Sequence, residues 1–187
     1  MKIETLDRRK LSEADARAVA ELLCAVWPKL GRTVETRVAQ LRSEWSEYRG
    51  PEEEFPRSAV VRDGGRVIAH AAALPRVIGT SQGEITILAL AQVCTDPAQR
   101  GRRLGQAVVR AVFDAVDHGP FPHALFQTTH PVRPFYEKLG CGLVTNRIVN
   151  SLGEDPAANP FWDEVVMRYP AAKPWPEGEI DLRGPGY

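Results

Sequence analysis

The chain has 187 residues, of which 43% are hydrophobic, enough for one well-buried core and short for two independent ones. Lysine plus arginine and aspartate plus glutamate both number 24, so no net charge points to nucleic acid or a membrane surface as the partner. The three cysteines, at positions 24, 94 and 141, lack metal-ligand spacing, and no signal-peptide core or membrane-length apolar run is present. We therefore expect a metal-free protein of the reducing cytoplasm.

The first quarter of the chain predicts one short strand and two helices. Residues 2–6 read as a strand, and Ser12 looks like the cap of a helix whose apolar positions continue to Trp27. Thr33 caps a second helix, with a periodic apolar face that ends at Trp45.

The middle of the chain predicts a hairpin followed by a long central strand. Two apolar runs in residues 58–78 are joined by Asp63, Gly64 and Gly65, a strong short-range hairpin signal. Residues 84–95 then form a nearly continuous apolar run, which is typical of a strand that is covered on both faces.

The remaining elements alternate between helices and strands. An apolar stripe predicts a helix that begins near Leu104 and stops at Gly119. The segments that follow predict a strand at 123–128, a helix at 132–139, a strand at 142–150 and a strand within 161–170. A hairpin combined with strand-helix-strand crossovers indicates an α+β fold, with a mixed sheet and helices on both of its faces.

A basic corner lies between the central strand and the helix that follows it, in the sequence CTDPAQRGRRLGQAVVRAV. A helix N-terminus exposes unpaired amides and the positive end of the helix dipole, which together hold phosphate groups. Gly101 and Gly105 would let a ligand approach the backbone, and three arginines add positive charge. On these grounds alone, a phosphate-binding loop and a solvated basic loop that caps a core helix are equally good readings. Neither a P-loop nor a dinucleotide fingerprint is present.

The segment VCTDPAQRGRRLGQAVV resembles the signature of the GNAT acetyltransferase superfamily, whose loop binds the pyrophosphate of acetyl-CoA. One residue departs from that signature, because Arg103 stands where the middle glycine is expected. Downstream, RPFYEKLGC resembles the second GNAT hallmark, a short helix that reads Phe-Tyr, two residues, Leu-Gly. The two motifs occur in the expected order, and the element order follows the superfamily from residue 1 to about 149.

The resemblance implies a GNAT-like acyl-CoA N-acyltransferase fold and a set of site residues. It places the general acid at Tyr136 and a bulge of the central strand against the thioester and pantetheine. The cofactor-binding residues that it implies are Val93, Cys94, Thr95, Arg100, Gly101, Arg102, Arg103, Leu104, Gly105 and Gln106. Read without the motif, Tyr136 would simply pack the helix onto the sheet.

The general base is not evident from the sequence. Glu84, which opens the central strand far from the expected bulge, is one candidate; His70 and His130 are others, each more readily explained as a structural or surface residue. Cys94 raises a covalent route through an acetylated thiol, which a buried cysteine disfavours.

The Pro- and Gly-rich tail, residues 170–187, is expected to pack over a single GNAT-like acetyltransferase domain at 1–169. Its end faintly resembles that of the aminoglycoside 2'-N-acetyltransferases, whose tail contributes to the amine-binding cleft. By that analogy Glu179, Asp181 or the carboxylate of Tyr187 would attract a cationic acceptor, whereas the simpler reading is a solvated tail that caps the sheet.

The resemblance predicts a monomeric or homodimeric enzyme that transfers an acetyl group from acetyl-CoA directly to a primary amine, most simply that of a small molecule. Protein N-termini or lysines are a variant acceptor. A non-catalytic acyl-CoA-binding or sensing domain is the alternative from another class. A nucleotide-binding module is a third, disfavoured by the second motif.

Overall fold

The computed structural model describes residues 2–187, and these fall into two compact units. Unit 1 comprises the residues up to Leu74 together with Ala91–Asp114, and unit 2 comprises Pro75–Leu90 and Ala115–Tyr187. Two long strands and one helix run from one unit into the other, and each unit is described by itself. The domain boundary at residue 169 stays a prediction.

Unit 1 contains the predicted N-terminal strand, the two predicted helices and the hairpin. Its elements are β1 (Ile3–Asp7), η1 (Arg8–Lys10), α1 (Glu13–Val26), α2 (Val34–Ser43), η2 (Glu52–Glu54), β2 (Arg57–Asp63), the first part of β3 (Arg66–Thr80), the end of β4 (Gly83–Thr95), η3 (Pro97–Gln99) and most of α3 (Leu104–Asp117).

Local signals explain where these elements begin and turn. The Ser12 side chain accepts from the Asp15 amide, and Thr33 accepts from the Thr36 amide, so both predicted N-caps are confirmed. Gly64 and Gly65 both have positive φ, at 53° and 86°, as a two-residue hairpin turn requires.

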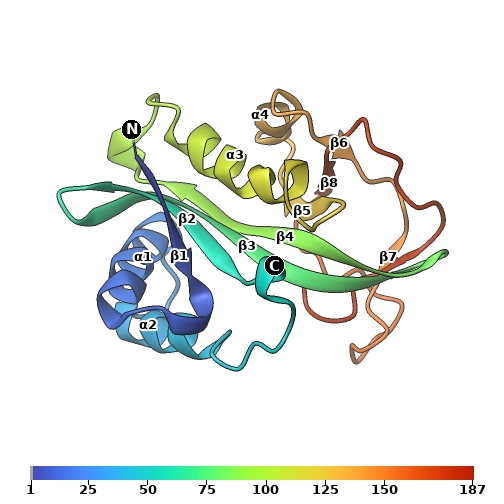
Figure 1. Ribbon diagram of the computed structural model, residues 1–187, viewed down its shortest axis with the longest axis horizontal. Coiled ribbons are helices and arrows are strands. Elements are labelled where there is room, and N and C mark those ends of the chain that lie inside the picture. Colours follow the sequence, from blue (N-terminus) through green and yellow to red (C-terminus); the bar gives the residue numbers. More distant parts are fainter. Residues whose placement is uncertain (1) are drawn as a thin grey trace. The chain divides into compact units, whose positions relative to one another are not determined.

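The core of unit 1 lies between the helix pair and the sheet. In the sheet, β1 pairs antiparallel with β2, and β2 pairs antiparallel with β3. Figure 1 shows α1 and α2 side by side on one face of β2 and β3, with α3 on the other face. Buried residues of α1 and α2, among them Leu23 and Leu41, form one cluster with Val60, Val67 and Cys94 from the strands. This confirms the expected helices on both faces of the sheet.

Unit 2 contains the parallel part of the sheet. Its elements are the end of β3, the start of β4, the last residues of α3, β5 (Ala124–Thr128), α4 (Arg133–Glu137), β6 (Gly142–Leu143), β7 (Ile148–Val149), β8 (Val165–Tyr169) and β9 (Ile180–Asp181). Strand β4 pairs parallel with β5, and β8 pairs antiparallel with β5 and β6, so the sheet is mixed, as predicted. Five successive buried residues, 87–91, confirm that β4 is covered on both faces.

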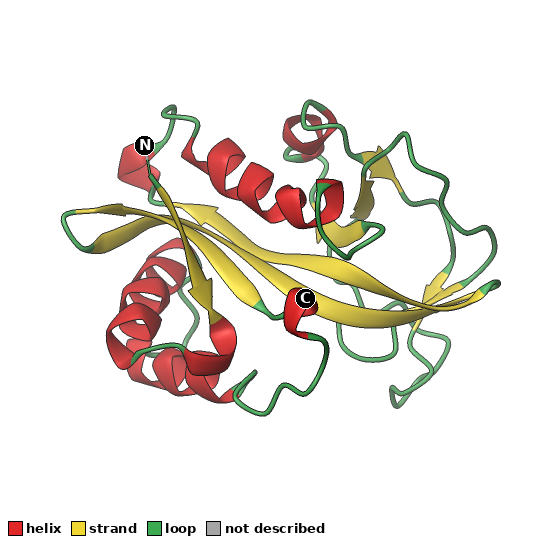
Figure 2. Ribbon diagram, in the orientation of Figure 1, coloured by secondary structure: helices red, strands yellow, loops and turns green. Residues whose placement is uncertain are grey.

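The prediction of one strand at 142–150 is wrong. The segment forms two short strands with different partners, because β6 pairs with β8 while β7 pairs with β9 from the tail. Asn146, between them, donates to the carbonyls of Pro176 and Gly178 and accepts from the Trp175 indole, which ties this turn to the tail. Figure 2 shows that most of the chain after β7 is loop.

Two tryptophans lie outside the helices in which they were expected. Trp27 is the residue after the end of α1 and is 41% exposed. Trp45 follows the end of α2, and its ring lies 6.2 Å from that of Tyr48. Both helices therefore end before the tryptophan that seemed to complete their apolar face.

Candidate active site

The basic corner is a structured loop with a fixed entry. Asp96 caps η3, because its carboxylate accepts from the Ala98 amide at 2.9 Å while its carbonyl accepts from the Gln99 amide at 2.8 Å. The same carboxylate forms an ion pair with Arg66 at 3.1 Å. The chain therefore leaves β4 in a defined direction.

Two residues of this loop have left-handed backbone conformations. Gly101 has a φ of 80°, and Arg103 has a φ of 59°. An arginine in this region costs about 1–2 kcal/mol relative to the right-handed conformation. The substitution at the middle glycine of the signature therefore leaves the backbone in the conformation that glycine favours.

The loop leads directly into the N-terminus of α3. The Ala107 amide donates to the Arg103 carbonyl at 3.1 Å, so the amides just before it have no carbonyl partner within the helix. Residues 100–103 are exposed, and a Cβ at Gly101 would meet open space. Arg102 is hydrogen-bonded to Gln99 within the loop, and the first turn of α3 carries no acidic residue. Free amides, the helix dipole and positive charge thus coincide here, which suits a diphosphate.

Strand β4 is irregular at Gln92, two residues before Cys94. Gln92 has a φ of 53°, which for a residue with a side chain requires support from its surroundings. His70 Nδ1 lies 2.8 Å from the Gln92 carbonyl oxygen, and Arg8 donates to the Gln92 side-chain oxygen at 3.2 Å. These contacts hold the irregularity in the strand that the resemblance assigns to the thioester.

The buried partners of His70 fix its protonation state. A carbonyl oxygen only accepts, so Nδ1 carries the proton, and Nε2 then accepts from the Ser58 hydroxyl at 2.9 Å. Ser58 in turn accepts from Arg8 at 3.4 Å, and Arg8 forms an ion pair with Glu44 at 2.7 Å. Burial lowers the pKa of His70 to about 3, although the hydrogen bond that His70 donates to the Gln92 carbonyl acts to raise it. A neutral imidazole with both nitrogens engaged is not available as the general base, so this candidate is removed.

Cys94 lies in the core between two residues of intermediate exposure, Val93 and Thr95. Cys94 is 6% exposed, and burial raises the pKa of its thiol to about 12. A thiolate is therefore scarce near neutral pH, which rules against the covalent route.

Tyr136 is a buried residue of α4 in unit 2. Its ring lies 4.5 Å from that of Phe126 and 4.9 Å from that of Phe135, so it packs this short helix onto β5. Burial, and then the neighbouring Cys141, raise the pKa of Tyr136 above its usual value. The phenol therefore keeps its proton, as a general acid must before it acts.

Glu84 and His130, the other candidates for the general base, lie in different surroundings. Glu84 is paired with Arg183 of the tail, which occupies its carboxylate. His130 is exposed, just ahead of α4. No base can be assigned from these contacts.

The acidic residues of the tail also have partners within unit 2. Asp181 accepts from the Ser151 amide at 2.9 Å, and Glu179 lies 3.5 Å from Arg147. The carbonyl oxygen of Tyr187 accepts from Gln127 at 2.8 Å. Strand β9 of the tail also pairs with β3 and β7, so the tail is fastened to the sheet of unit 2. The attraction of a cationic acceptor stays a prediction.

Sequence reasoning missed Arg8 and Ser58. Arg8 is fully buried, although its setting in the sequence DRRK looks like a solvated charged turn. No signal in the sequence could have identified it, because its partners Glu44, Ser58 and Gln92 are 36 to 84 positions away.

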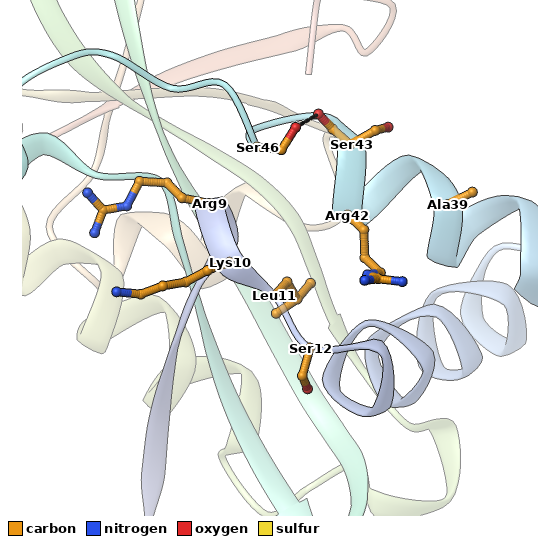
Figure 3. Close-up of a pocket in the computed structure, with 8 residues that line it drawn as sticks. All are labelled: Arg9, Lys10, Leu11, Ser12, Ala39, Arg42, Ser43 and Ser46. Atoms are coloured by element: carbon orange, nitrogen blue, oxygen red, sulfur yellow. Dashed lines mark hydrogen bonds between the residues drawn. The ribbon is translucent and has the colours of Figure 1, made fainter.

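A hollow of about 620 Å³ lies beside η1, lined by Arg9, Lys10, Leu11, Ser12, Ala39, Arg42, Ser43 and Ser46. Figure 3 shows Arg9 and Lys10 pointing away from α2, while Arg42 points toward α1. Arg9 and Lys10 are paired with Asp7, and Arg42 lies 3.7 Å from Glu13. The cations of this hollow are already neutralised, and we assign it no role.

Within residues 2–187, no three His, Cys, Asp or Glu side chains are grouped so that they could hold a metal ion. None of the helices in this part of the chain combines the length and the apolar character needed to cross a membrane.

Comparison with protein families finds a match over residues 7–144 to the model described as "Acetyltransferase (GNAT) domain". Comparison with curated protein sequences finds no match.

Several solved structures have a similar fold. Glucosamine-6-phosphate N-acetyltransferase from Arabidopsis thaliana has a TM-score of 0.57 at 18% identity, with 75% of this chain and 91% of that chain covered. ElaA from Escherichia coli has a TM-score of 0.56 at 16% identity, with 89% and 97% covered. A GCN5-related N-acetyltransferase from Kribbella flavida has a TM-score of 0.57 at 18% identity, and 76% of this chain spans 33% of that chain. At these identities the likeness establishes the fold. None of the three is an aminoglycoside acetyltransferase, so the resemblance of the tail stays a prediction.

Proposed function

The chain belongs to the GNAT acetyltransferase family, and we propose that it transfers an acetyl group from acetyl-CoA directly to the primary amine of a small molecule. The observation that carries this proposal is the loop before α3. Its left-handed Arg103 preserves the backbone of the family signature although the glycine is lost. Exposed amides, the start of α3 and positive charge meet at this loop, which favours a phosphate-binding loop over a solvated turn.

The loop would hold the diphosphate of acetyl-CoA. The amides of Gly101 to Gln106 supply hydrogen-bond donors, and the α3 dipole adds a partial positive charge. The exposed Arg100 and Arg103 would contribute guanidinium groups, which bind phosphate through two donors. The absence of acidic residues from the first turn of α3 is consistent with this role.

The strand segment Val93, Cys94 and Thr95 would hold the thioester end. Backbone amides there would donate to the carbonyl oxygen as negative charge develops on it during attack by the amine. The irregularity at Gln92 supports this role, because it departs from regular strand geometry immediately before these residues.

Tyr136 would act as the general acid. The neutral amine attacks the thioester carbonyl and forms the C–N bond, the C–S bond breaks, and the departing sulfur takes the phenolic proton. The nitrogen releases its extra proton to water, and the Tyr136 phenolate regains a proton from water, so the enzyme returns to its starting state. The raised pKa of Tyr136 keeps the phenolic proton in place beforehand. It also makes a stepwise transfer to a thiolate unfavourable, so the proton must move as the C–S bond breaks.

A non-catalytic acyl-CoA-binding or sensing domain is the second candidate. It is favoured by one observation: of the three candidates for the base, His70 and Glu84 are engaged by other groups, and only the exposed His130 is left. In that case the loop would bind the ligand while no acetyl group was transferred.

A thermal-shift titration with acetyl-CoA, followed by thiol release with a panel of amines, separates the two. The enzyme predicts stabilisation by acetyl-CoA and free CoA in the presence of at least one amine, above the rate without amine. Stabilisation without thiol release from any amine would favour the sensing domain, and no stabilisation would contradict both.

A further inference from the structure

Arg37 is a buried cation without a counter-ion. It is 6% exposed, and its Nε has no hydrogen-bond partner. None of the ion pairs formed by residues 2–187 includes it. Arg8, the other buried arginine of unit 1, is paired with Glu44 at 2.7 Å. The contrast matters because a buried charge is costly unless it is paired.

Carboxylates near Arg37 in the sequence are engaged by other arginines. The ion pairs of α1 and α2 join Glu13 to Arg17 and Arg42, Glu35 to Arg17, and Glu44 to Arg8. Asp15 is paired with Arg62, and Glu21 is exposed and outside these pairs, so neutralising Arg37 from within the helices would need Glu21 to leave the solvent or an existing pair to break. The missing partner is more simply an anion that comes from outside the chain.

Arg37 lies on the side of α2 that faces β4. Residues three and four apart share one face of a helix, so Arg37 lies on the same face as Val34 and Leu41. Val34 packs against the buried cluster that contains Leu41 and Cys94. The charge of Arg37 also acts on the Cys94 thiol, where it opposes the effect of burial on the thiol pKa. Arg37 therefore lies on the face of α2 that packs against the cluster containing Cys94.

We propose that Arg37 binds an oxyanion, either a carboxylate or a phosphate, that is carried by the acceptor amine. This inference rests on the proposed function, which assigns residues 93–95 to the thioester. The attacking amine must approach that end of acetyl-CoA, whereas the phosphates of CoA are assigned to the exposed loop at 100–106. An anionic group beside Cys94 therefore belongs to the acceptor, and Arg37 selects acceptors that carry one.

Paired acceptors test this selection. L-lysine carries a carboxylate that cadaverine lacks, and glucosamine 6-phosphate carries a phosphate that glucosamine lacks. In at least one pair, we expect kcat/KM to be about 10- to 100-fold higher for the member with the oxyanion, the usual range for a buried charged hydrogen bond. The pair that shows the difference identifies the source of the anion. Arg37→Met should abolish the difference, and Arg37→Lys should retain part of it.

A second readout needs no turnover. With CoA at a saturating concentration, so that the loop before α3 is filled, inorganic phosphate or acetate should raise the Tm of the wild type, and Arg37→Met should lose this response while its own Tm without anion rises. Arg42→Met is the matched control, because Arg42 lies on the same helix and is paired with Glu13. It should respond to anions as the wild type does. If Arg37→Met fails to fold, Arg37→Gln takes its place.

The outcomes separate this inference from the proposed function. If the wild type turns over no amine, but Arg37→Met loses the Tm response to anions, the proposed acetyltransferase activity is contradicted while the oxyanion site is supported. An unchanged acceptor preference and an unchanged anion response in Arg37→Met would overturn the inference. A weaker Kd for acetyl-CoA with an unchanged preference would also overturn it, because Arg37 would then serve the phosphates of CoA.

Discussion

Replacing His70 with leucine removes two buried hydrogen bonds that support the backbone of Gln92. The Gln92 carbonyl loses its donor at 2.8 Å, and the Ser58 hydroxyl loses its acceptor at 2.9 Å. A buried carbonyl without a partner costs about 1–3 kcal/mol, and the bond to Ser58 contributes about 0.5–1.5 kcal/mol. We therefore expect the free energy of unfolding to fall by roughly 2–4 kcal/mol in urea denaturation.

A second substitution distinguishes stability from positioning. Glycine at position 92 adopts a positive φ without the steric penalty of a Cβ, about 1–2 kcal/mol, so the irregular strand no longer depends on His70. In the wild-type background, His70→Leu should lower kcat/KM for the best amine about 10- to 100-fold, as misplaced reacting groups do. In the Gln92→Gly background, the same change should lower it by less than about 3-fold.

Two outcomes of this double-mutant cycle would contradict the positioning role of His70. Equal losses of kcat/KM in the two backgrounds would mean that His70 does not act through Gln92. If only the free energy of unfolding changed, and kcat/KM did not, the irregularity in β4 would be irrelevant to turnover and the reasoning would be refuted.

Three further predictions follow from the site. Tyr136→Phe should lower kcat by about 10²–10⁴ with little change in the calorimetric Kd of acetyl-CoA, because it removes a proton donor and no binding group; an unaffected kcat would eliminate it as the acid. Gly105→Glu should abolish acetyl-CoA binding in a variant that still unfolds cooperatively, since a side chain and a negative charge enter the loop; normal affinity would refute the assignment. Burial lowers the pKa of His70 to about 3 from 6.5, so below pH 6.5 the unfolded state binds more protons and the free energy of unfolding falls. The fall should reach about 1.4 kcal/mol per pH unit, and a pH titration of His70→Leu that showed the wild-type slope would contradict this.

The fold was largely predictable because its strongest signals are local. Ser12 and Thr33 cap helices through their own side chains, and Gly64 with Gly65 closes the hairpin, so each signal acts over a few residues. The apolar run of β4 needed no partner to be recognised. The segment 142–150 was misjudged because its pairing depends on β9 and Asn146, contacts with a tail some thirty residues away.

The site residues likewise differ in whether a local sequence motif indicates them. The loop and Tyr136 could be proposed as site residues because their motifs are contiguous in the sequence. The support of Gln92 by Arg8 and His70 could not be found, because these side chains meet only in the folded protein. The missing partner of Arg37 was equally hidden, since an unpaired charge is recognised only when all its neighbours are known.

The central claim is that the loop before α3 binds the diphosphate of acetyl-CoA. A crystal structure with bound CoA tests it most directly. The account predicts the diphosphate on the amides of Gly101 to Gln106, with Arg103 still left-handed. CoA bound elsewhere, with these amides facing only solvent, would contradict it.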